Sequence, residues 1–361
     1  MSALPHDEVS DIRVIPRLRA AHVERDIPRP GSLVLYFEAY SDLPDHIPPQ
    51  FRRADLLTML RAVASSRGRI LELPEPLWVR FYPASLTIAL VWRLSGALRR
   101  INRKARFYAI ENNDVGHVVF GSARPAMRRL LERPIAALIG ASISTLFERV
   151  AFGSDGSFET YRSIPLCRPL KHRVFLELPQ RADTSTTPRA YSAIFVGGLE
   201  VRKGIPFLLS AWERVEEALP ESTLTIVGAG PLAQEVHAWA DKNPARRSAT
   251  GSLGRSDVAA ALAQSAVLVA PSQRSGRWRE QIGLPISEAL ARGLTVVTTD
   301  ETGLSSWLGE HGHTVVPAQT SAERLTTAIV STLLEPLDRA AVQDALPAED
   351  GRRRAHRWLH S

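Results

Sequence analysis

The sequence predicts an α/β protein made of two Rossmann-like, doubly wound domains. Short apolar runs alternate with helix-like segments at intervals of about 25–35 residues after residue 190. Loops that contain glycine follow several of these runs, as in sheets that bind nucleotides at their carboxyl edge. The 361 residues are also enough for two domains with separate cores.

The second half of the chain shows the clearest alternation. Short, continuous apolar runs are typical of strands buried in a parallel sheet, and ligands are expected beyond the carboxyl ends of such strands. Strands are predicted at Ala193–Val196, Thr223–Val227, Val267–Ala270, Thr295–Thr298 and Thr314–Val316. Helices are predicted at Pro206–Leu219, Leu232–Asp241, Ser256–Gln264, Pro285–Arg292 and Ala322–Leu334.

The first half is interpreted as a second α/β domain. Residues 179–190 are polar, contain proline and lack periodicity, which predicts a linker. The predicted domains are therefore residues 1–178 and 191–335, and residues 336–361 form a basic helical tail that could pack back on the first domain. In the first half, strands are predicted at Leu33–Phe37, Phe107–Glu111 and Val150–Phe152, and helices at Ala54–Ser66, Leu86–Arg100 and Ala126–Leu131.

The composition is that of a globular protein, with 44% apolar and 23% charged residues. The single cysteine, Cys167, excludes an intramolecular disulfide and suits a reducing compartment. The N-terminus lacks the basic and apolar regions of a signal peptide, and the apolar run Leu86–Ser95 is too short to cross a bilayer. A cytoplasmic protein is expected.

Positive charge is concentrated in the first half of the chain. Residues 1–190 carry 28 basic and 19 acidic side chains, whereas residues 191–361 carry 17 and 19. The segment Trp92–Lys104 is both basic and amphipathic. Such a patch could place the protein peripherally on an anionic membrane surface or meet a charged acceptor, although a solvated helix face is an equal alternative. No nucleic-acid-binding motif is present, so nucleic acid is not an expected partner.

The first candidate loop follows the predicted strand Ala193–Val196. Gly197 and Gly198 would let the backbone approach a ligand closely. Arg202 and Lys203 follow, and a lysine at the end of such a loop can neutralise phosphate. The chain has only four lysines against 41 arginines, so Lys203 is less readily explained as an ordinary surface residue. A solvated lysine remains the alternative.

Two further loops follow the next predicted strands. Gly228, Gly230 and Pro231 fit a nucleotide loop before a helix, but the acidic residue that a dehydrogenase places about 20 positions later is missing. This loop therefore favours phosphate or nucleotide binding and argues against NAD. Ser252 and Leu253 could let backbone groups pair with a nucleobase edge, or could form an ordinary turn.

The most informative stretch runs from Arg279 to Leu290. Glu280 and Glu288 lie on either side of Gly283, Leu284 and Pro285, where a helix is expected to begin. Backbone N–H groups at a helix start attract phosphate, and glutamates can accept hydrogen bonds from sugar or ribose hydroxyls. This combination suits a nucleotide sugar. Two glutamates at this spacing also occur by chance in many helices.

These motifs in this order resemble the donor domain of the GT-B glycosyltransferases, particularly the retaining family 4. The resemblance covers residues 191–317 and implies two Rossmann-like domains facing each other across a cleft. It implies that Glu288 holds the ribose, that Glu280 contacts sugar hydroxyls and that Lys203 neutralises the diphosphate. It further implies that the N–H groups of Gly283 and Leu284 meet sugar and phosphate, with Glu280 and Lys203 in the catalytic centre.

The sequence departs from the family at Gly198, where an arginine usually supplies a second cation for the diphosphate. The candidates for its replacement are Arg202 and the loop residues Arg274, Arg277 and Arg279, and a loop arginine is favoured because its guanidinium can clamp a diphosphate. Ile282 stands where the family often has phenylalanine. The family often places a histidine after a central strand of the first domain. On this acceptor side the candidates here are Glu111, Asn112 and His117.

The expected function is transfer of a sugar from a nucleotide diphosphate-sugar to an acceptor hydroxyl, with retention, in the assembly of a glycan, exopolysaccharide or glycolipid. The expected enzyme is of the hexosyltransferase type, needs no metal because no ligand spacing is apparent, and uses the nucleotide sugar as co-substrate rather than a cofactor. The acceptor would be a glycan or a lipid-linked molecule. Two alternatives stay open: a non-catalytic nucleotide-sugar-binding partner in polysaccharide assembly, and an NAD-dependent oxidoreductase.

Overall fold

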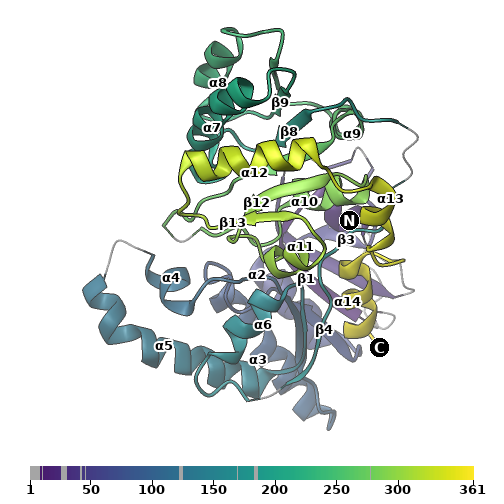
Figure 1. Ribbon diagram of the computed structural model, residues 1–361. Coiled ribbons are helices and arrows are strands. Elements are labelled where there is room, and N and C mark those ends of the chain that lie inside the picture. Colours follow the sequence, from purple (N-terminus) through teal and green to yellow (C-terminus); the bar gives the residue numbers. More distant parts are fainter. Residues whose placement is uncertain are drawn as a thin grey trace. The chain divides into compact units, whose positions relative to one another are not determined.

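The computed structural model describes residues 9, 11–25, 31–40, 43–44, 46–121, 125–168, 170–182, 186–276 and 278–361 (Figure 1). It divides into two compact units, the first from Met1–Leu176 with Arg352–Ser361 and the second from Glu177–Gly351. The end of the first predicted domain, residue 178, lies two residues beyond this division. The predicted linker 179–190 falls in the second unit, and only the last ten residues of the predicted tail 336–361 fall in the first. None of the described helices is long and apolar enough to span a bilayer.

The first unit contains a seven-stranded parallel sheet in the order β3-β2-β1-β4-β5-β6-β7. The strands are β1 (Asp11–Leu18), β2 (Ser32–Ala39), β3 (Phe51–Arg53), β4 (Ile70–Leu73), β5 (Ala105–Ala109), β6 (Phe147–Phe152) and β7 (Lys171–Val174). The helices are α1 (Ala20–Glu24), α2 (Leu56–Ser65), α3 (Tyr82–Leu98), α4 (Val115–Phe120), α5 (Pro125–Leu146), α6 (Asp155–Arg162) and, from the end of the chain, α14 (Gly351–Leu359).

The second unit contains a six-stranded parallel sheet in the order β10-β9-β8-β11-β12-β13. Its strands are β8 (Ser192–Val196), β9 (Thr223–Val227), β10 (Arg247–Gly251), β11 (Val267–Ala270), β12 (Thr295–Thr299) and β13 (Thr314–Val316). Its helices are η1 (Val201–Lys203), α7 (Ile205–Ala218), α8 (Ala233–Ala240), α9 (Arg255–Gln264), α10 (Leu284–Ala291), α11 (Ser305–Glu310), α12 (Ala322–Leu334) and α13 (Arg339–Asp344).

In each parallel sheet the order in which successive strands are added reverses at one point, between β1 and β4 in the first unit and between β8 and β11 in the second. Loops after the two strands at such a point diverge to opposite faces of the sheet and leave room for a ligand at the carboxyl edge. Each sheet has its own core, in which Phe107 and Phe147 pack edge to face at 5.1 Å in the first unit and Trp212 is fully buried in the second. The predicted α/β fold class, with two doubly wound parallel sheets, is confirmed.

The predicted elements of the second half agree closely with the structure. The bounds of β9, β11, β13 and α12 match residue for residue, because these segments are continuous apolar strands or a strongly periodic helix. Three elements, β10, η1 and α11, were not predicted, whereas α13 lies within residues 336–361, which were predicted as a helical tail. In the first half the predicted strands are present, but β5 ends at Ala109, and α5 extends from Pro125 to Leu146 where only Ala126–Leu131 was predicted.

The strand β1, in the interior of the first sheet, was not predicted because its sequence does not look apolar. It carries Asp11, Arg13 and Arg17, and Pro16 interrupts its pattern. Asp11 and Arg13 are nevertheless buried, at 8% and 7% exposure, because charged groups from distant parts of the chain pair with them. A strand whose buried charges are paired cannot be recognised from hydropathy alone.

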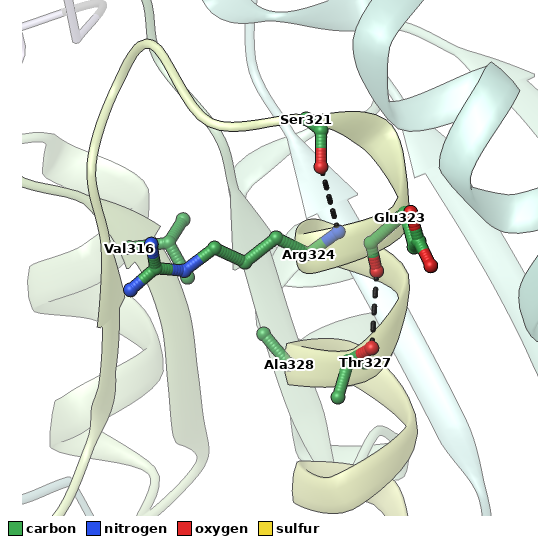
Figure 2. A pocket seen from close by; sticks show the side chains of 6 residues that line it. All are labelled: Val316, Ser321, Glu323, Arg324, Thr327 and Ala328. Carbon is green, nitrogen blue, oxygen red and sulfur yellow. Dashed lines mark hydrogen bonds between the residues drawn. The ribbon is translucent and has the colours of Figure 1, made fainter.

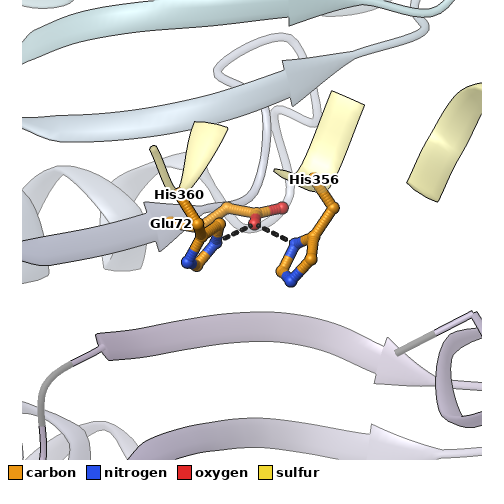
Figure 3. Close-up of side chains that lie close together, drawn as sticks. All are labelled: Glu72, His356 and His360. Carbon is orange, nitrogen blue, oxygen red and sulfur yellow. Dashed lines mark hydrogen bonds and ion pairs between the residues drawn. The ribbon is translucent and has the colours of Figure 1, made fainter. Parts of the chain in front are cut away.

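Helix α14 fixes the end of the chain to the first sheet through one carboxylate, Glu72 of β4 (Figure 3). Glu72 Oε2 accepts hydrogen bonds from His356 Nδ1 at 3.1 Å and from His360 Nε2 at 2.8 Å. The other oxygen, Oε1, lies 3.3 Å from Arg352 and 3.5 Å from Arg13. The C-terminal carbonyls of the helix accept hydrogen bonds from Arg149, at 3.0 Å for Trp358 O, which suits the negative end of a helix dipole.

The second nitrogen of His360, Nδ1, lies 3.3 Å from Asp11 Oδ2. Because both ring nitrogens face carboxylate oxygens that only accept, both carry hydrogen and the ring is an imidazolium. Burial alone would lower the pKa of His360, but Asp11 and Glu72 outweigh it and raise this pKa above 6.5. For Glu72, burial alone would raise the pKa, but Arg13 and the two histidines hold it well below its usual range. Burial lowers the pKa of His356 to about 4, so that ring is neutral near pH 7.

We expect the attachment of α14 to weaken as the pH rises. Since the pKa of His360 is raised on folding, its contribution is complete below the unfolded value of 6.5 and is lost as the pH passes through the folded value. His356 acts oppositely and lowers stability as the pH falls from 6.5 toward about 4. His360→Gln should therefore flatten the alkaline side of the profile of unfolding midpoint against pH, measured in urea between about pH 6 and about pH 9.

The exposed His237 of the second unit provides a matched control, His237→Gln, which should keep the wild-type profile. Parallel profiles for His360→Gln and the wild type would show that the imidazolium does not stabilise the tail.

Candidate functional site

Three glycine loops meet at the carboxyl edge of the second sheet. A Cβ atom on Gly228 would lie 1.8 Å from the carbonyl oxygen of Gly197, and one on Gly230 would lie 2.5 Å from that of Leu199. The loops are also tied by hydrogen bonds from Leu199 N to Ala229 O at 2.9 Å and from Gly228 N to Gly251 O at 2.8 Å. Only glycine allows this close approach, so the packing of the loops requires Gly228 and Gly230 whether or not a ligand binds there. Pro231, exposed, follows at the start of the next helix segment.

Another glycine, Gly204, joins the loops that follow β8 and β11. Gly204 has φ +76°, and a Cβ atom there would lie 2.0 Å from the carbonyl oxygen of Pro271. Gln273 N donates to Arg202 O at 2.8 Å beside this contact. The strands β8 and β11 are neighbours at the point where the strand order reverses. Residues of both loops therefore come together at the place expected for a ligand.

This contact brings Lys203 to Glu280. Lys203 Nζ forms an ion pair with Glu280 Oε2, and the same oxygen accepts a hydrogen bond from Ser272 Oγ at 2.9 Å. The side chains are largely buried, with 19% of Lys203 and 13% of Glu280 exposed. The sequence named both as catalytic candidates without predicting that they would touch. The structure thus places an ammonium, a carboxylate and a hydroxyl in one cluster.

Trp278 provides a surface for two cations of the same loop. Arg202 lies 4.4 Å from the centre of its ring and Lys203 lies 4.9 Å from it, both within the range of cation–π attraction. The guanidinium of Arg202 also binds Glu200 through two hydrogen bonds, at 2.6 and 3.0 Å. Trp278 was not among the predicted site residues, although an aromatic residue within a polar, arginine-rich loop was visible in the sequence.

Two of the three loop arginines, Arg274 and Arg279, pair with Glu301. Arg279 donates to Glu301 Oε2 at 2.8 Å, and Arg274 lies 3.5 Å from the same oxygen. Arg277 lies outside the described residues. Arg202 is therefore the described arginine that shares Trp278 with Lys203, next to the position of Gly198. A Cβ atom on Gly198 would meet only the flexible end of Glu200, at 2.9 Å.

Helix α10 begins where the sequence predicted. Gly283 has φ +83° and caps the helix, and its carbonyl accepts from Ile286 N at 2.9 Å. Leu284 is exposed, whereas the side chain of Ile282 is buried and its carbonyl accepts from Thr302 at 2.8 Å. Glu288 lies half-buried one turn into the helix. At the edge of the sheet, Ser252 is exposed and Leu253 half-buried at the end of β10.

The three predicted acceptor-side residues lie in the first unit, at or after the loop that follows β5. Glu111 is half-buried and its Oε1 accepts from Asn113 N at 3.0 Å, while Asn112 is buried. His117 lies on α4, where its ring pairs with Asp114 and lies 3.1 Å from Arg128. The structure therefore groups Glu111 and Asn112 at the carboxyl edge and ties His117 into a separate ion-pair network.

A titratable group that the sequence interpretation missed lies beside them. Glu75 follows β4, and its Oε2 accepts hydrogen bonds from Ile110 N at 3.2 Å, Glu111 N at 3.1 Å and Tyr161 Oη at 3.2 Å. Burial, together with the charge of Glu111, raises the pKa of Glu75 to about 8. A neutral carboxylic acid thus holds the loop that carries Glu111. The signal was a carboxylate between two prolines directly after an unrecognised strand.

Residues 190–335 match the protein-family model "Glycosyl transferases group 1". The matched segment contains the four glycine contacts, Lys203, Trp278 and both glutamates. This part of the chain is a glycosyl transferases group 1 domain. The sequence of the loop from Gly228 to Pro231 already argued against NAD, and the family match gives the NAD-dependent alternative no support.

Solved structures with a similar fold align with nearly the whole chain, beyond the glycosyl transferases group 1 domain alone. HepE from Anabaena, in complex with UDP, aligns with a TM-score of 0.64 at 12% identity and covers 93% of each chain. The apo form of the lipopolysaccharide outer core galactosyltransferase WaaB aligns at 0.65 and 10% identity, over 98% of this chain and 99% of that one. WaaG, a glycosyltransferase involved in lipopolysaccharide biosynthesis, aligns at 0.56 and 15% identity, over 96% and 95%. The predicted GT-B fold is confirmed. No curated protein sequence is significantly similar to this chain.

Two other features of the described residues resemble binding sites. Glu72, His356 and His360 offer donor atoms within 4.8 Å of one another, a set that metals such as zinc accept. Arg13 and Arg352 already neutralise Glu72, and His360 bonds to carboxylates through both nitrogens, so this cluster is satisfied without a metal ion. A hollow of about 450 Å³ beside α12 is lined by Val316, Ser321, Glu323, Arg324, Thr327 and Ala328. Figure 2 shows these six side chains. None of these six residues belongs to the predicted site.

We expect Glu75 to make the stability of the protein fall as the pH rises. Its folded pKa of about 8 lies above the unfolded value of 4.5, so the folded state holds a proton that the unfolded state loses. The contribution is complete below 4.5 and declines until the pH passes about 8. Glu75→Gln keeps the neutral shape and should lose this decline, so that the variant gains stability relative to wild type between about pH 5 and about pH 9. Urea unfolding across this range measures the difference.

Replacement of the exposed Glu221 by Gln should leave the decline unchanged. If Glu75→Gln and the wild type lose stability in parallel, the carboxyl group is ionised in the folded protein and the assignment fails.

Proposed function

We propose that this protein is a retaining glycosyltransferase that moves a sugar from a nucleotide diphosphate-sugar to an acceptor hydroxyl. The observation that carries the proposal is the cluster of Lys203, Glu280 and Ser272 at the carboxyl ends of β8 and β11, within a glycosyl transferases group 1 domain. An ammonium beside a carboxylate at this position supplies both a partner for phosphate and an acceptor for sugar hydroxyls.

The departing diphosphate gains negative charge as the bond to the sugar breaks. Lys203, Arg202 and the N-terminus of α10 at Gly283 are the groups proposed to stabilise that charge. Lys203 is held by Glu280 in the structure, so the ammonium is already oriented before a donor arrives. Arg202, stacked on Trp278, is proposed to replace the arginine that the family usually carries at the position of Gly198.

The two glutamates are proposed to bind the donor rather than to form a covalent bond with it. Glu280 would accept hydrogen bonds from sugar hydroxyls, and Glu288 would accept them from the ribose. Exclusion of water around the donor would limit its hydrolysis. The acceptor is proposed to contact the first unit near Glu111 and Asn112, with the loop held by Glu75.

A uridine diphosphate-sugar is the first donor to test, because HepE was solved with UDP and with UDP-glucose on the same fold. A hexose is proposed as the sugar, and a glycan or lipid-linked molecule as the acceptor, in line with the lipopolysaccharide roles of WaaG and WaaB. The proposed reaction uses the cations of the donor loops in place of a metal ion. A cytoplasmic site of action agrees with the single cysteine, Cys167.

A non-catalytic nucleotide-sugar-binding role is the second candidate. It is favoured by one observation, the glycine at position 198, which removes a cation that the reaction uses. Donor binding without turnover would favour this role, whereas turnover would exclude it.

A thermal-shift screen with UDP-, GDP-, ADP- and dTDP-sugars tests the proposal, because a ligand that binds the folded state raises its unfolding temperature. We expect one nucleotide class to raise the midpoint of the wild type. Glu288→Ala should lose the shift for that class while keeping the unliganded midpoint, since its side chain is half-buried on the surface of α10. A full shift with Glu288→Ala would remove this residue from the donor site, and no shift with any sugar would contradict the function.

Replacement of Lys203 should weaken donor binding and slow turnover together. A charge-assisted hydrogen bond to phosphate contributes about 1.5–3 kcal/mol, so Lys203→Ala should raise the donor KM at least about tenfold and also lower kcat. Steady-state kinetics with the donor identified by the screen measures both constants.

The chain offers a matched control in Lys242, an exposed lysine of the same unit. Lys242→Ala should behave as the wild type. Equal kinetics for Lys203→Ala and Lys242→Ala would mean that another cation, with Arg202 the first to test, neutralises the diphosphate.

A further inference from the structure

Large apolar side chains are exposed along two helices of the first unit, α3 and α5. Figure 1 labels both helices. The two helices contact each other, since Arg93 of α3 donates to the carbonyl of Thr145 on α5 at 2.6 Å and Tyr82 hydrogen-bonds to Ser142. The exposed residues on the pair are Leu90, Leu94 and Leu98 of α3 and Met127, Leu130, Leu131 and Leu138 of α5. Single exposed apolar residues are ordinary, but an ordered set on two neighbouring helices calls for a partner.

The exposed apolar residues of α5 lie on one face of the helix. Met127, Leu130, Leu131 and Leu138, together with Pro134, follow the spacing i, i+3, i+4, i+11 and i+7, which places them on a single stripe. Leu130 is 76% exposed and Leu138 is 71% exposed. The opposite face enters the core through Ile139 and Ile143. Helix α5 is therefore apolar on two sides, of which only one is covered within the first unit.

The exposed residues of α3 are arranged in the same way. Leu90, Leu94 and Leu98 are four residues apart, and Leu98 is 88% exposed. Trp92 is fully buried on the other side, where the guanidinium of Arg103 lies 4.3 Å from its ring. The basic segment Trp92–Lys104 named from the sequence thus divides: Arg103 is part of the interior, and the leucines form the outer surface.

Positive charge borders both stripes. No acidic residue occurs between positions 76 and 110, a stretch that holds seven basic ones. Of these, Arg99 and Arg100 are exposed at the end of α3, directly after Leu98. On α5, Arg129 and Arg133 are exposed one turn apart, and Arg133 lies three residues after Leu130. Apolar stripes with exposed arginines beside them are complementary to a surface that has anionic groups on its outside and an apolar layer beneath them.

We propose that the face formed by α3 and α5 docks the protein on an anionic lipid bilayer, with the leucines inserted at the level of the headgroups and the arginines on the phosphates. Helices of this kind lie in the plane of the interface, and buried apolar area and attraction to anionic lipid contribute together. A water-soluble protein partner would need acidic groups opposite the arginines and a shaped apolar surface. An anionic bilayer supplies negative charge opposite the arginines and an apolar interior for the leucines, and it needs no shaped surface to do so. The inference does not depend on sugar transfer.

Co-sedimentation with vesicles tests the docking face, with the full chain and with vesicles of equal parts phosphatidylglycerol and phosphatidylcholine. The wild type should partition to these vesicles, should be released from them by salt, and should bind much less to vesicles of phosphatidylcholine alone. The pairs Leu130→Ser with Leu138→Ser and Leu94→Ser with Leu98→Ser should each lower the partition coefficient at least about tenfold. Circular dichroism should show unchanged folding, because all four side chains lie at the surface.

Leu334→Ser in the second unit is the matched control, since this leucine is 52% exposed and lies outside the face. It should bind as the wild type. The proposal is overturned if the wild type does not bind the mixed vesicles, if either leucine pair binds as well as the wild type, or if the wild type pellets without vesicles while the leucine pairs do not, which would mean self-association. The nucleotide-sugar thermal shift of the same variants should be unchanged, so a failure of docking is distinguishable from a failure of the proposed function.

Discussion

The close approach of Gly204 to the carbonyl of Pro271 is the constraint on which the arrangement in the second unit depends. With no side chain between them, the loops after β8 and β11 touch, and residues 77 positions apart in the chain form the Lys203–Glu280 ion pair. Any larger residue at position 204 would separate the loops and would also have to adopt a positive φ. The same contact positions η1, and with it the cations that stack on Trp278. One backbone contact thus orients both charges of the cluster.

The second unit was largely predictable because its local signals and its tertiary structure agree. The strand β11 is apolar throughout and β9 is rich in β-branched and apolar residues, since helices cover both faces of a parallel sheet, and loops with glycine follow β8 and β9. What could not be predicted there was the choice of partner for each arginine. Arg202 and Arg279 both lie in polar loops that follow a strand, but Arg202 lies on Trp278 and Arg279 pairs with Glu301. That choice is made by side chains far away in the sequence.

The first unit was harder to predict because its central strands carry charges that are neutralised from a distance. Glu72 of β4 is paired with His360, which lies 288 residues later, and Asp11 of β1 with the same histidine. No local pattern distinguishes such a carboxylate from one at the surface. The loop candidates Glu111 and Asn112 could be named from a strand that was recognised, whereas Glu75 follows a strand that was not. The missed titratable group and the missed strand therefore have the same cause.

The return of α14 to the first sheet changes how the whole chain is connected. Because the chain leaves the first unit after Leu176 and re-enters it at Arg352, the glycosyl transferases group 1 domain is an insertion with both ends tethered, and not an appended module. The His360–Glu72 contact closes that long loop without a covalent bond, and the entropy of closure grows only slowly with the length of the insert. The inserted domain can therefore gain or lose surface residues at little cost to the contact that holds its two ends.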